Sequence, residues 1–176
     1  QLEASEIDAV LGMVQASELH TGEKILQSQI VKAEVLLQKG LVEEANKILE
    51  RIVGFQSDLT KNWLLRAQTW FAWTLAALGK MDNAFAVIRD VIDSDPSLIG
   101  AQQVLAEILA LSDEVQEAVE QAQLVVELAP DLVDNLLWAG EFFTNIGKTE
   151  KAIEVLSDGA KLYPEDLRFE LSLAQL

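Results

Sequence analysis

The sequence predicts an all-α protein built as a solenoid of stacked helical hairpins. Its composition favours helices, because Ala, Leu, Val, Glu and Gln dominate while the 176 residues include only 3 prolines and 9 glycines. The prolines recur 34 residues apart, and an alanine recurs in the same register. These markers are Pro96, Pro130 and Pro164, with Ala84, Ala118 and Ala152. Such a fixed period is the signature of a repeat architecture, so we expect one solenoid domain over residues 1–176.

The first expected element is an amphipathic helix over residues 3–20. Ile7, Leu11 and Val14 fall on one of its faces. Its small residues are spaced as in the second helix of a hairpin, so we expect it to complete a preceding unit. The chain does not begin with Met, and we therefore expect it to be a piece of a longer protein.

Four hairpins follow, over residues 22–57, 60–96, 97–130 and 131–164. The last three end at the recurring proline, which lacks an N–H and restricts the residue before it. A turn residue separates the two helices of these hairpins; it is Gly79, Asp113 and Gly147 in chain order.

The first hairpin is divergent. It lies 39 residues from the next, measured from Ala45 to Ala84, and Ser57 stands where a proline is expected. Residues 165–176 predict one more helix. Its side chains would leave an apolar end on the solenoid, namely Phe169, Leu171, Leu173 and Leu176.

The repeat resembles the tetratricopeptide repeat family, whose pattern is Trp-x2-Leu-Gly-x2-Tyr, then Ala-x3-Phe, then Pro. The best match is Leu136-x2-Ala139-Gly140-x2-Phe143, followed by Ala152-x3-Leu156 and Pro164. The resemblance implies a right-handed superhelix of about four repeats plus flanking helices. It also implies that the first helix of each hairpin lines a concave groove that binds protein segments.

Small residues recur where the two helices of each hairpin are expected to cross. The first helices carry Ala33, Ala72, Ala106 and Gly140, and the second helices carry Ala45, Ala84, Ala118 and Ala152. Small side chains at a crossing let two helices approach closely, while larger neighbours fill the seam.

The charge balance narrows the partner class. The formal net charge is −16, from 13 basic and 29 acidic residues. Such a surface repels phosphate backbones and anionic lipid, so we expect no nucleic-acid partner. The apolar stretches are too short to span a bilayer, so we expect no membrane insertion either. A basic protein or peptide is the partner that the charge favours, although acidity also serves solubility alone.

The sequence offers little for catalysis or cofactor binding. His20 is the only histidine, and cysteine is absent. No phosphate-binding glycine loop, HExxH motif or calcium-loop spacing is present. We therefore expect no catalytic residue, no metal site and no cofactor.

The candidate partner-binding residues lie on the first helices. Counted from Leu26, Leu65, Ile99 and Val133, the ninth positions hold Glu34, Trp73, Glu107 and Glu141. The other candidates come from the second, fifth and sixth positions: Arg66, Thr69, Trp70, Gln103, Leu137 and Trp138. Together they predict a row of carboxylates broken by indoles, with the indoles as anchors. For each tryptophan, simple packing between adjacent helices is the alternative.

Two further readings stay open. The chain could be a structural module that joins domains or copies of itself through its terminal helices. Joining copies would make it a homo-oligomer. An enzyme or small-molecule site between helices is the other alternative. The sequence does not distinguish a cytoplasmic protein from a periplasmic one.

Overall fold

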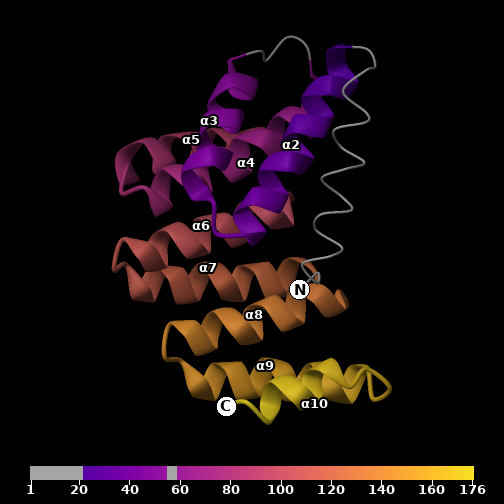
Figure 1. Ribbon diagram of the computed structural model, residues 1–176. Helices are drawn as coiled ribbons and strands as arrows, with labels where there is room; N and C mark the ends of the chain where they lie inside the picture. The colour runs from indigo at the N-terminus through magenta and orange to yellow at the C-terminus, as the bar shows by residue number, and fades with distance from the viewer. Residues whose placement is uncertain (1–21, 55–58) are drawn as a thin grey trace. The chain divides into compact units, whose positions relative to one another are not determined.

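The structure, a computed structural model, describes residues 22–54 and 59–176. The helix predicted over residues 3–20, together with His20 and Ser57, lies outside this part. Every regular element of the described residues is an α-helix (Figure 1). The helices are α2 (Gly22–Gln38), α3 (Val42–Val53), α4 (Lys61–Ala77), α5 (Met81–Ser94), α6 (Ile99–Leu111), α7 (Val115–Leu128), α8 (Val133–Asn145), α9 (Thr149–Leu162) and α10 (Arg168–Leu173).

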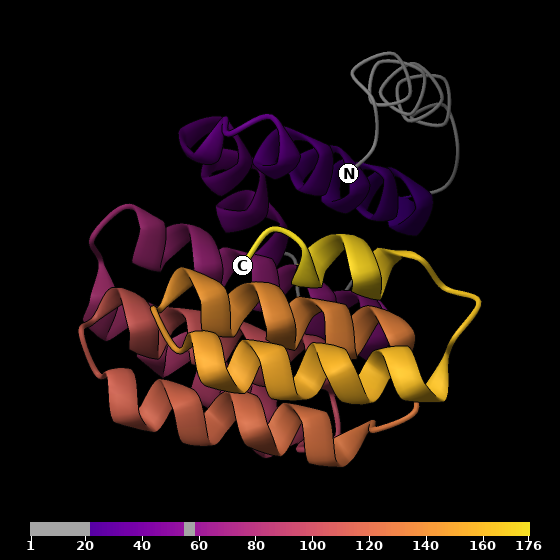
Figure 2. The same ribbon diagram turned by 90° about the horizontal axis from the view of Figure 1, so that it is seen from below.

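The helices form two compact units, one ending at Ser94 and the other covering Asp95–Leu176. Unit 1 contains α2 to α5, and unit 2 contains α6 to α10. Consecutive helices pair into hairpins, with α3 also packed on α4 in unit 1 and α7 on α8 in unit 2. The short α10 packs on α8 and α9, beside which it is drawn in Figure 2. The single domain over 1–176 stays a prediction.

The hairpin turns lie at the predicted positions and share one backbone conformation. Gly79, Asp113 and Gly147 have φ angles of 77°, 67° and 72°, and Gly40 has 74°. In each turn two backbone N–H groups bond back into the preceding helix, as Lys80 does to the Leu75 carbonyl at 2.8 Å. Such paired bonds satisfy carbonyls at the helix end, and they require a left-handed residue.

The recurring proline ends the second helices as predicted. Helices α5, α7 and α9 stop at Ser94, Leu128 and Leu162, two residues before Pro96, Pro130 and Pro164. The small residues are likewise buried at the crossings. All seven alanines of that set are 0% exposed, and a Cβ on Gly140 would collide with the Leu156 side chain. The all-α hairpin-repeat prediction is therefore confirmed.

Each unit has its own hydrophobic core. In unit 1 one cluster joins α2, α3 and α4 around Ile30, Leu49 and Ala67. Unit 2 has two clusters, one around Ala106, Ala122 and Phe143 and a second made of Leu136, Leu156 and Phe169.

The apolar end predicted on the last helix differs from the structure at two residues, since Leu173 is partly buried against the second core cluster of unit 2 and Phe169 is fully buried. Phe169 is 0% exposed, because its ring packs over Gly159 and near Tyr163, with ring centroids 6.3 Å apart. It therefore belongs to the core of unit 2. Leu171, by contrast, is 62% exposed.

Candidate partner-binding face

In unit 1, one carboxylate joins the two first helices. Arg66 on α4 donates from Nε and Nη2 to the two carboxylate oxygens of Glu34 on α2, each at 2.5 Å. The indole Nε1 of Trp70 donates to Oε1 of the same glutamate at 2.8 Å. The Glu34 side chain is only 14% exposed, and that of Arg66 is 48% exposed. Glu34, Arg66 and Trp70 thus form one bonded group, and the charge of Glu34 is balanced within the chain.

Arg66 is held on a second side by an aromatic ring. Its guanidinium carbon lies 5.1 Å from the ring centroid of Trp63, one turn earlier on α4. The hydrogen bonds to Glu34 raise the pKa of Arg66 above its ordinary value, against the opposing effect of burial. The guanidinium therefore remains charged and fixed in direction.

The other candidate residues on α4 differ in their exposure to solvent. Thr69 is buried, and its hydroxyl donates to the Leu65 carbonyl at 2.7 Å, so it offers nothing to a partner. Trp70 packs against the core of unit 1 and is only partly buried. Trp73, three residues further on the same helix, is also partly buried.

In unit 2, the same kind of bond joins α6 to α8. The indole Nε1 of Trp138 donates to Oε1 of Glu107 at 3.1 Å. The indole also stacks on Phe142, with centroids 5.2 Å apart and ring planes 20° apart. Trp138 is therefore fixed through both its edge and its face, while it stays partly exposed.

The remaining candidates of unit 2 lie on the same two helices. Gln103 donates from its amide to Oδ1 of Asn135 at 3.1 Å. Leu137 is partly buried and packs against the second core cluster of the unit. Glu141 is exposed, one turn beyond Trp138. Asn135 was not predicted, although it is buried and its amide also bonds the Val125 carbonyl at 2.9 Å.

The two indole–carboxylate bonds occupy equivalent positions. In each unit the ninth residue of one first helix accepts from the sixth residue of the next, as Glu34 does from Trp70 and Glu107 from Trp138. Such a bond orients the indole and leaves part of its apolar surface open. An aromatic side chain held in this way loses little freedom when a partner covers it. The continuous row of glutamates across both units stays a prediction.

Sequence reasoning missed one charged pair on this face. Arg168 on α10 donates to Asp134 on α8 at 3.0 Å and to Asp166 at 2.7 Å. Asp134 occupies the position that Arg66 holds in unit 1. A search for opposite charges one repeat apart would have found the pair, because 34 residues separate Asp134 from Arg168.

Two other kinds of site are not found in residues 22–54 and 59–176. These residues contain no cluster of three or more His, Asp or Glu side chains able to hold a metal ion. No helix among them is long and apolar enough to cross a membrane.

Comparisons with known proteins bear on the repeat and on the fold. The tetratricopeptide repeat family matches residues 65–98. No curated protein matches the sequence.

Several solved structures share the fold. A thermophilic TPR protein of Thermus thermophilus is 17% identical, with a TM-score of 0.77 over 97% of this chain and 90% of that chain. MamA of Desulfovibrio magneticus RS-1 is 14% identical, with a TM-score of 0.59 over 91% and 87% of the two chains. YrrB, a TPR protein with an unusual peptide-binding site, is 20% identical, with a TM-score of 0.54 over 98% and 85%.

The predicted resemblance is thereby confirmed: residues 65–98 match the tetratricopeptide repeat family, and the described chain has the fold of that family.

Proposed function

We propose that this chain is a protein-interaction scaffold whose first helices bind a segment of a partner protein. Tetratricopeptide proteins bind other proteins or peptides, and YrrB carries a peptide-binding site. Each unit carries its own candidate residues, which are Arg66, Trp70 and Trp73 in unit 1 and Leu137, Trp138 and Glu141 in unit 2. Helices α4 and α8 carry these residues.

The observation that carries the proposal is the repeated indole–carboxylate bond. A tryptophan needed only for packing is expected to have its ring fully buried, and its N–H needs a hydrogen-bond partner in either case. Trp70 and Trp138 instead stay partly exposed, and each has its N–H bonded to a glutamate of the preceding first helix. Partly exposed, rigid aromatic rings are typical of the residues that contribute most to binding energy.

The charges of the site favour a basic segment. Glu141 is exposed beside Trp138, and the whole chain carries a net charge of −16. Carboxylates at such positions attract a basic partner over distance and mainly raise its association rate. In unit 1 the chain's own Arg66 already balances Glu34, so we assign the selection of basic groups to unit 2.

The test begins with affinity capture of a partner by the whole chain, followed by kinetics on three variants. Glu141→Gln is expected to slow association and to reduce its dependence on salt. Trp138→Ala is expected to raise the dissociation rate, at a cost of about 2 kcal/mol or more in binding. Glu120→Gln on α7 is the control, because Glu120 is exposed on a second helix.

The folded state of every variant is checked by its helical circular dichroism and its melting temperature. The proposal is wrong if the folded Glu141→Gln and Trp138→Ala variants bind like the parent chain. A loss confined to Glu120→Gln would also contradict it.

A second candidate function, joining copies through the last helix, has one observation in its favour. Leu167 and Leu171 are 63% and 62% exposed at the end of unit 2. Concentration-dependent assembly that disappears in Leu167→Ser/Leu171→Ser would support this candidate. Phe169 is unsuitable for the test, because its buried ring is needed for folding.

A further inference from the structure

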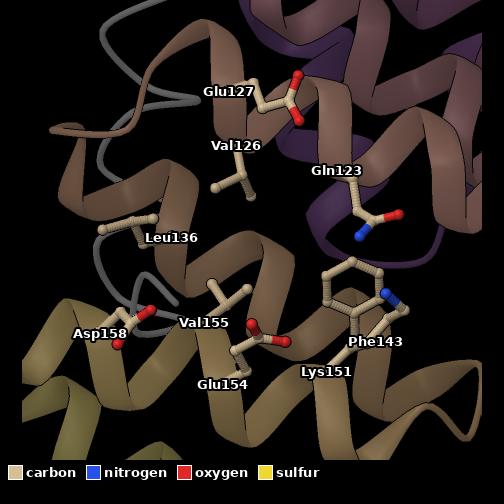
Figure 3. Close-up of a pocket in the computed structure, with 9 residues that line it drawn as sticks. All are labelled: Gln123, Val126, Glu127, Leu136, Phe143, Lys151, Glu154, Val155 and Asp158. Carbon is tan, nitrogen blue, oxygen red and sulfur yellow. The ribbon is translucent and has the colours of Figure 1, made fainter.

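Unit 2 has a pocket on its second-helix side, between α7 and α9 (Figure 3). Its volume is about 210 Å³. The apolar lining consists of Val126 from α7, Leu136 and Phe143 from α8, and Val155 from α9. None of these residues belongs to the first-helix site proposed above.

The floor of the pocket lies over the junction between the two core clusters of unit 2. Leu136 belongs to one cluster and Phe143 to the other, and they are 4% and 1% exposed. Val126 and Val155 are partly buried and pack against both clusters. A side chain that enters between these valines would meet apolar surface that the core itself already supports.

Carboxylates surround this apolar floor. Glu127, Glu154 and Asp158 line the pocket and are exposed; Figure 3 shows Glu127 beside Val126, and Glu154 and Asp158 beside Val155. Lys151 is the one basic side chain in the lining, and Lys161 outside it pairs with Asp158 at 2.7 Å, so the excess of negative charge comes from Glu127 and Glu154. The rim therefore carries an excess of negative charge around an apolar centre, which complements an apolar side chain flanked by basic ones.

The size of the pocket distinguishes among ligands. Sites for cofactors and drug-sized molecules have volumes of about 300–1,000 Å³. A pocket of about 210 Å³ is smaller than that and suits a single anchoring side chain.

The pocket is separate from the candidate first-helix site. Leu136 precedes Trp138 by two residues, which is about 200° around a helix. The two side chains therefore leave α8 on opposite sides. Although Trp138 and Phe143 share one core cluster, the pocket and the surface over Trp138 face different sides of α8, so the valine and indole signals can report on them separately.

The corresponding groove in unit 1 has different chemistry. By the repeat register, Gly54 corresponds to Glu127, Gln68 to Leu136 and Ala86 to Glu154. Unit 1 thus lacks two of the acidic rim positions and one of the apolar floor positions. The combination of acidic rim and apolar floor therefore depends on the residue types at these positions in unit 2. It does not follow from the hairpin fold itself.

We propose that the α7–α9 pocket is a second docking site, which takes one apolar side chain from a segment of a partner protein with Lys or Arg on both sides. The apolar side chain enters between Val126 and Val155. The flanking basic groups pair with Glu127 and Glu154. A partner with acidic flanks is repelled.

The experiment titrates the whole chain with a synthetic pentapeptide in which one leucine is flanked on each side by Lys-Arg. Methyl NMR spectra follow Val126 and Val155, and the indole N–H signals are recorded in the same samples. We expect saturable shifts of both valines. Two matched peptides, one with serine for leucine and one with Glu-Glu flanks, are expected to leave the valine signals in place.

Charge reversal on the rim separates this site from a general effect of acidity. Glu127→Lys/Glu154→Lys is expected to weaken the peptide at least about tenfold. Glu120→Lys/Glu150→Lys makes the same change in net charge at exposed positions of α7 and α9 outside the pocket, and its effect is expected to be much smaller. The melting temperatures of both double variants are compared first.

Three results would overturn the proposal. The first is the absence of valine shifts up to about 1 mM peptide, a concentration that still detects weak binding. The second is an equal response to the acid-flanked peptide or an equal loss in the control variant. The third is a shift of the indole signals alone, which would place the peptide on the first helices and support the function proposed above.

Discussion

In unit 1 the glutamate that accepts the indole N–H also accepts two bonds from Arg66, whereas in unit 2 the position of Arg66 is held by Asp134. Asp134 instead accepts a hydrogen bond from Arg168 on α10. The first-helix face of unit 1 is therefore balanced by its own arginine, while that of unit 2 presents carboxylates. The repeat determines where side chains of successive helices meet, and the residue chosen at each position determines the charge there. Two units of one fold thus offer different surfaces to a partner.

The largest expected effect concerns what the two units share, the close crossing of each hairpin. Ala45→Leu in unit 1 and Ala152→Leu in unit 2 should each destabilise the chain by about 1–3 kcal/mol through overpacking. Both alanines are 0% exposed. Denaturant unfolding measures the change, with Ala86→Leu at an exposed position of α5 as the control. If Ala152→Leu costs no more than the control, the crossing register of unit 2 is wrong.

The next prediction concerns the difference between the units. A double-mutant cycle on Glu34→Gln and Arg66→Met should give a coupling of about 1 kcal/mol, because the two-point bond is strong but Arg66 is half exposed. The matched cycle on Glu107→Gln and Asp134→Asn should give no favourable coupling. Equal coupling energies in the two cycles would contradict the proposed difference in charge balance between the two units.

The same contrast can be sharpened by transplanting the arginine. Asp134 occupies the repeat position of Arg66, and Glu107 occupies that of Glu34. We therefore expect the guanidinium introduced by Asp134→Arg to approach Glu107. The variant should weaken the attraction of unit 2 for a basic partner, measured as a slower association rate at low salt. Asp134→Asn, which removes the charge without adding a cation, is the control. An unchanged rate in both variants would exclude this position from the electrostatic attraction.

A smaller effect is expected at the turns, where unit 1 has glycine twice and unit 2 has one aspartate. Asp113 adopts a φ of 67°, which costs energy for a residue with a Cβ. Asp113→Gly should therefore stabilise the chain by about 0.5–1 kcal/mol, after the added freedom of the unfolded glycine is subtracted. Thermal unfolding measures it, and Gly147→Asp should show the opposite sign. A destabilised Asp113→Gly would mean that the aspartate side chain stabilises its turn.

The smallest effect involves the exposed pair Asp166 and Arg168. The hydrogen bond from Arg168 lowers the pKa of Asp166 below its ordinary value of 3.8. A lowered pKa stabilises the folded state above the ordinary value, and this contribution disappears as the pH falls through the lowered pKa. Asp166→Asn should therefore reduce the melting temperature slightly at neutral pH and not at the acid end. A reduction that is the same at both ends would rule out the charged bond as its cause.

The sequence was sufficient to predict the fold because each repeat contains its own helix-end and turn residues. Pro96 and Gly79 mark a helix end and a turn through local backbone geometry, which needs no knowledge of the rest of the chain. Alanines at fixed spacing likewise predict the crossings. These signals act within one hairpin, and the structure confirms them.

The candidate face was less predictable, because its properties depend on which side chains meet between repeats. Counting along the helices located Glu34 and Trp70 but did not show that Arg66 would occupy the same carboxylate. Thr69 was placed on the face, yet its hydroxyl bonds its own helix. Phe169 was assigned to an open end because no sequence signal indicated that Gly159 leaves room for its ring.

The most direct test of the first-helix site is an indole N–H spectrum of the 15N-labelled chain, titrated with a captured partner. The chain has four tryptophans, and single Trp→Phe variants assign their indole signals. Binding over the first helices predicts that the signals of Trp70, Trp73 or Trp138 shift in proportion to the bound fraction, with Trp138 the strongest for a basic partner. If the partner saturates the chain while all four indole signals stay in place, the first-helix face is not the site at which it binds.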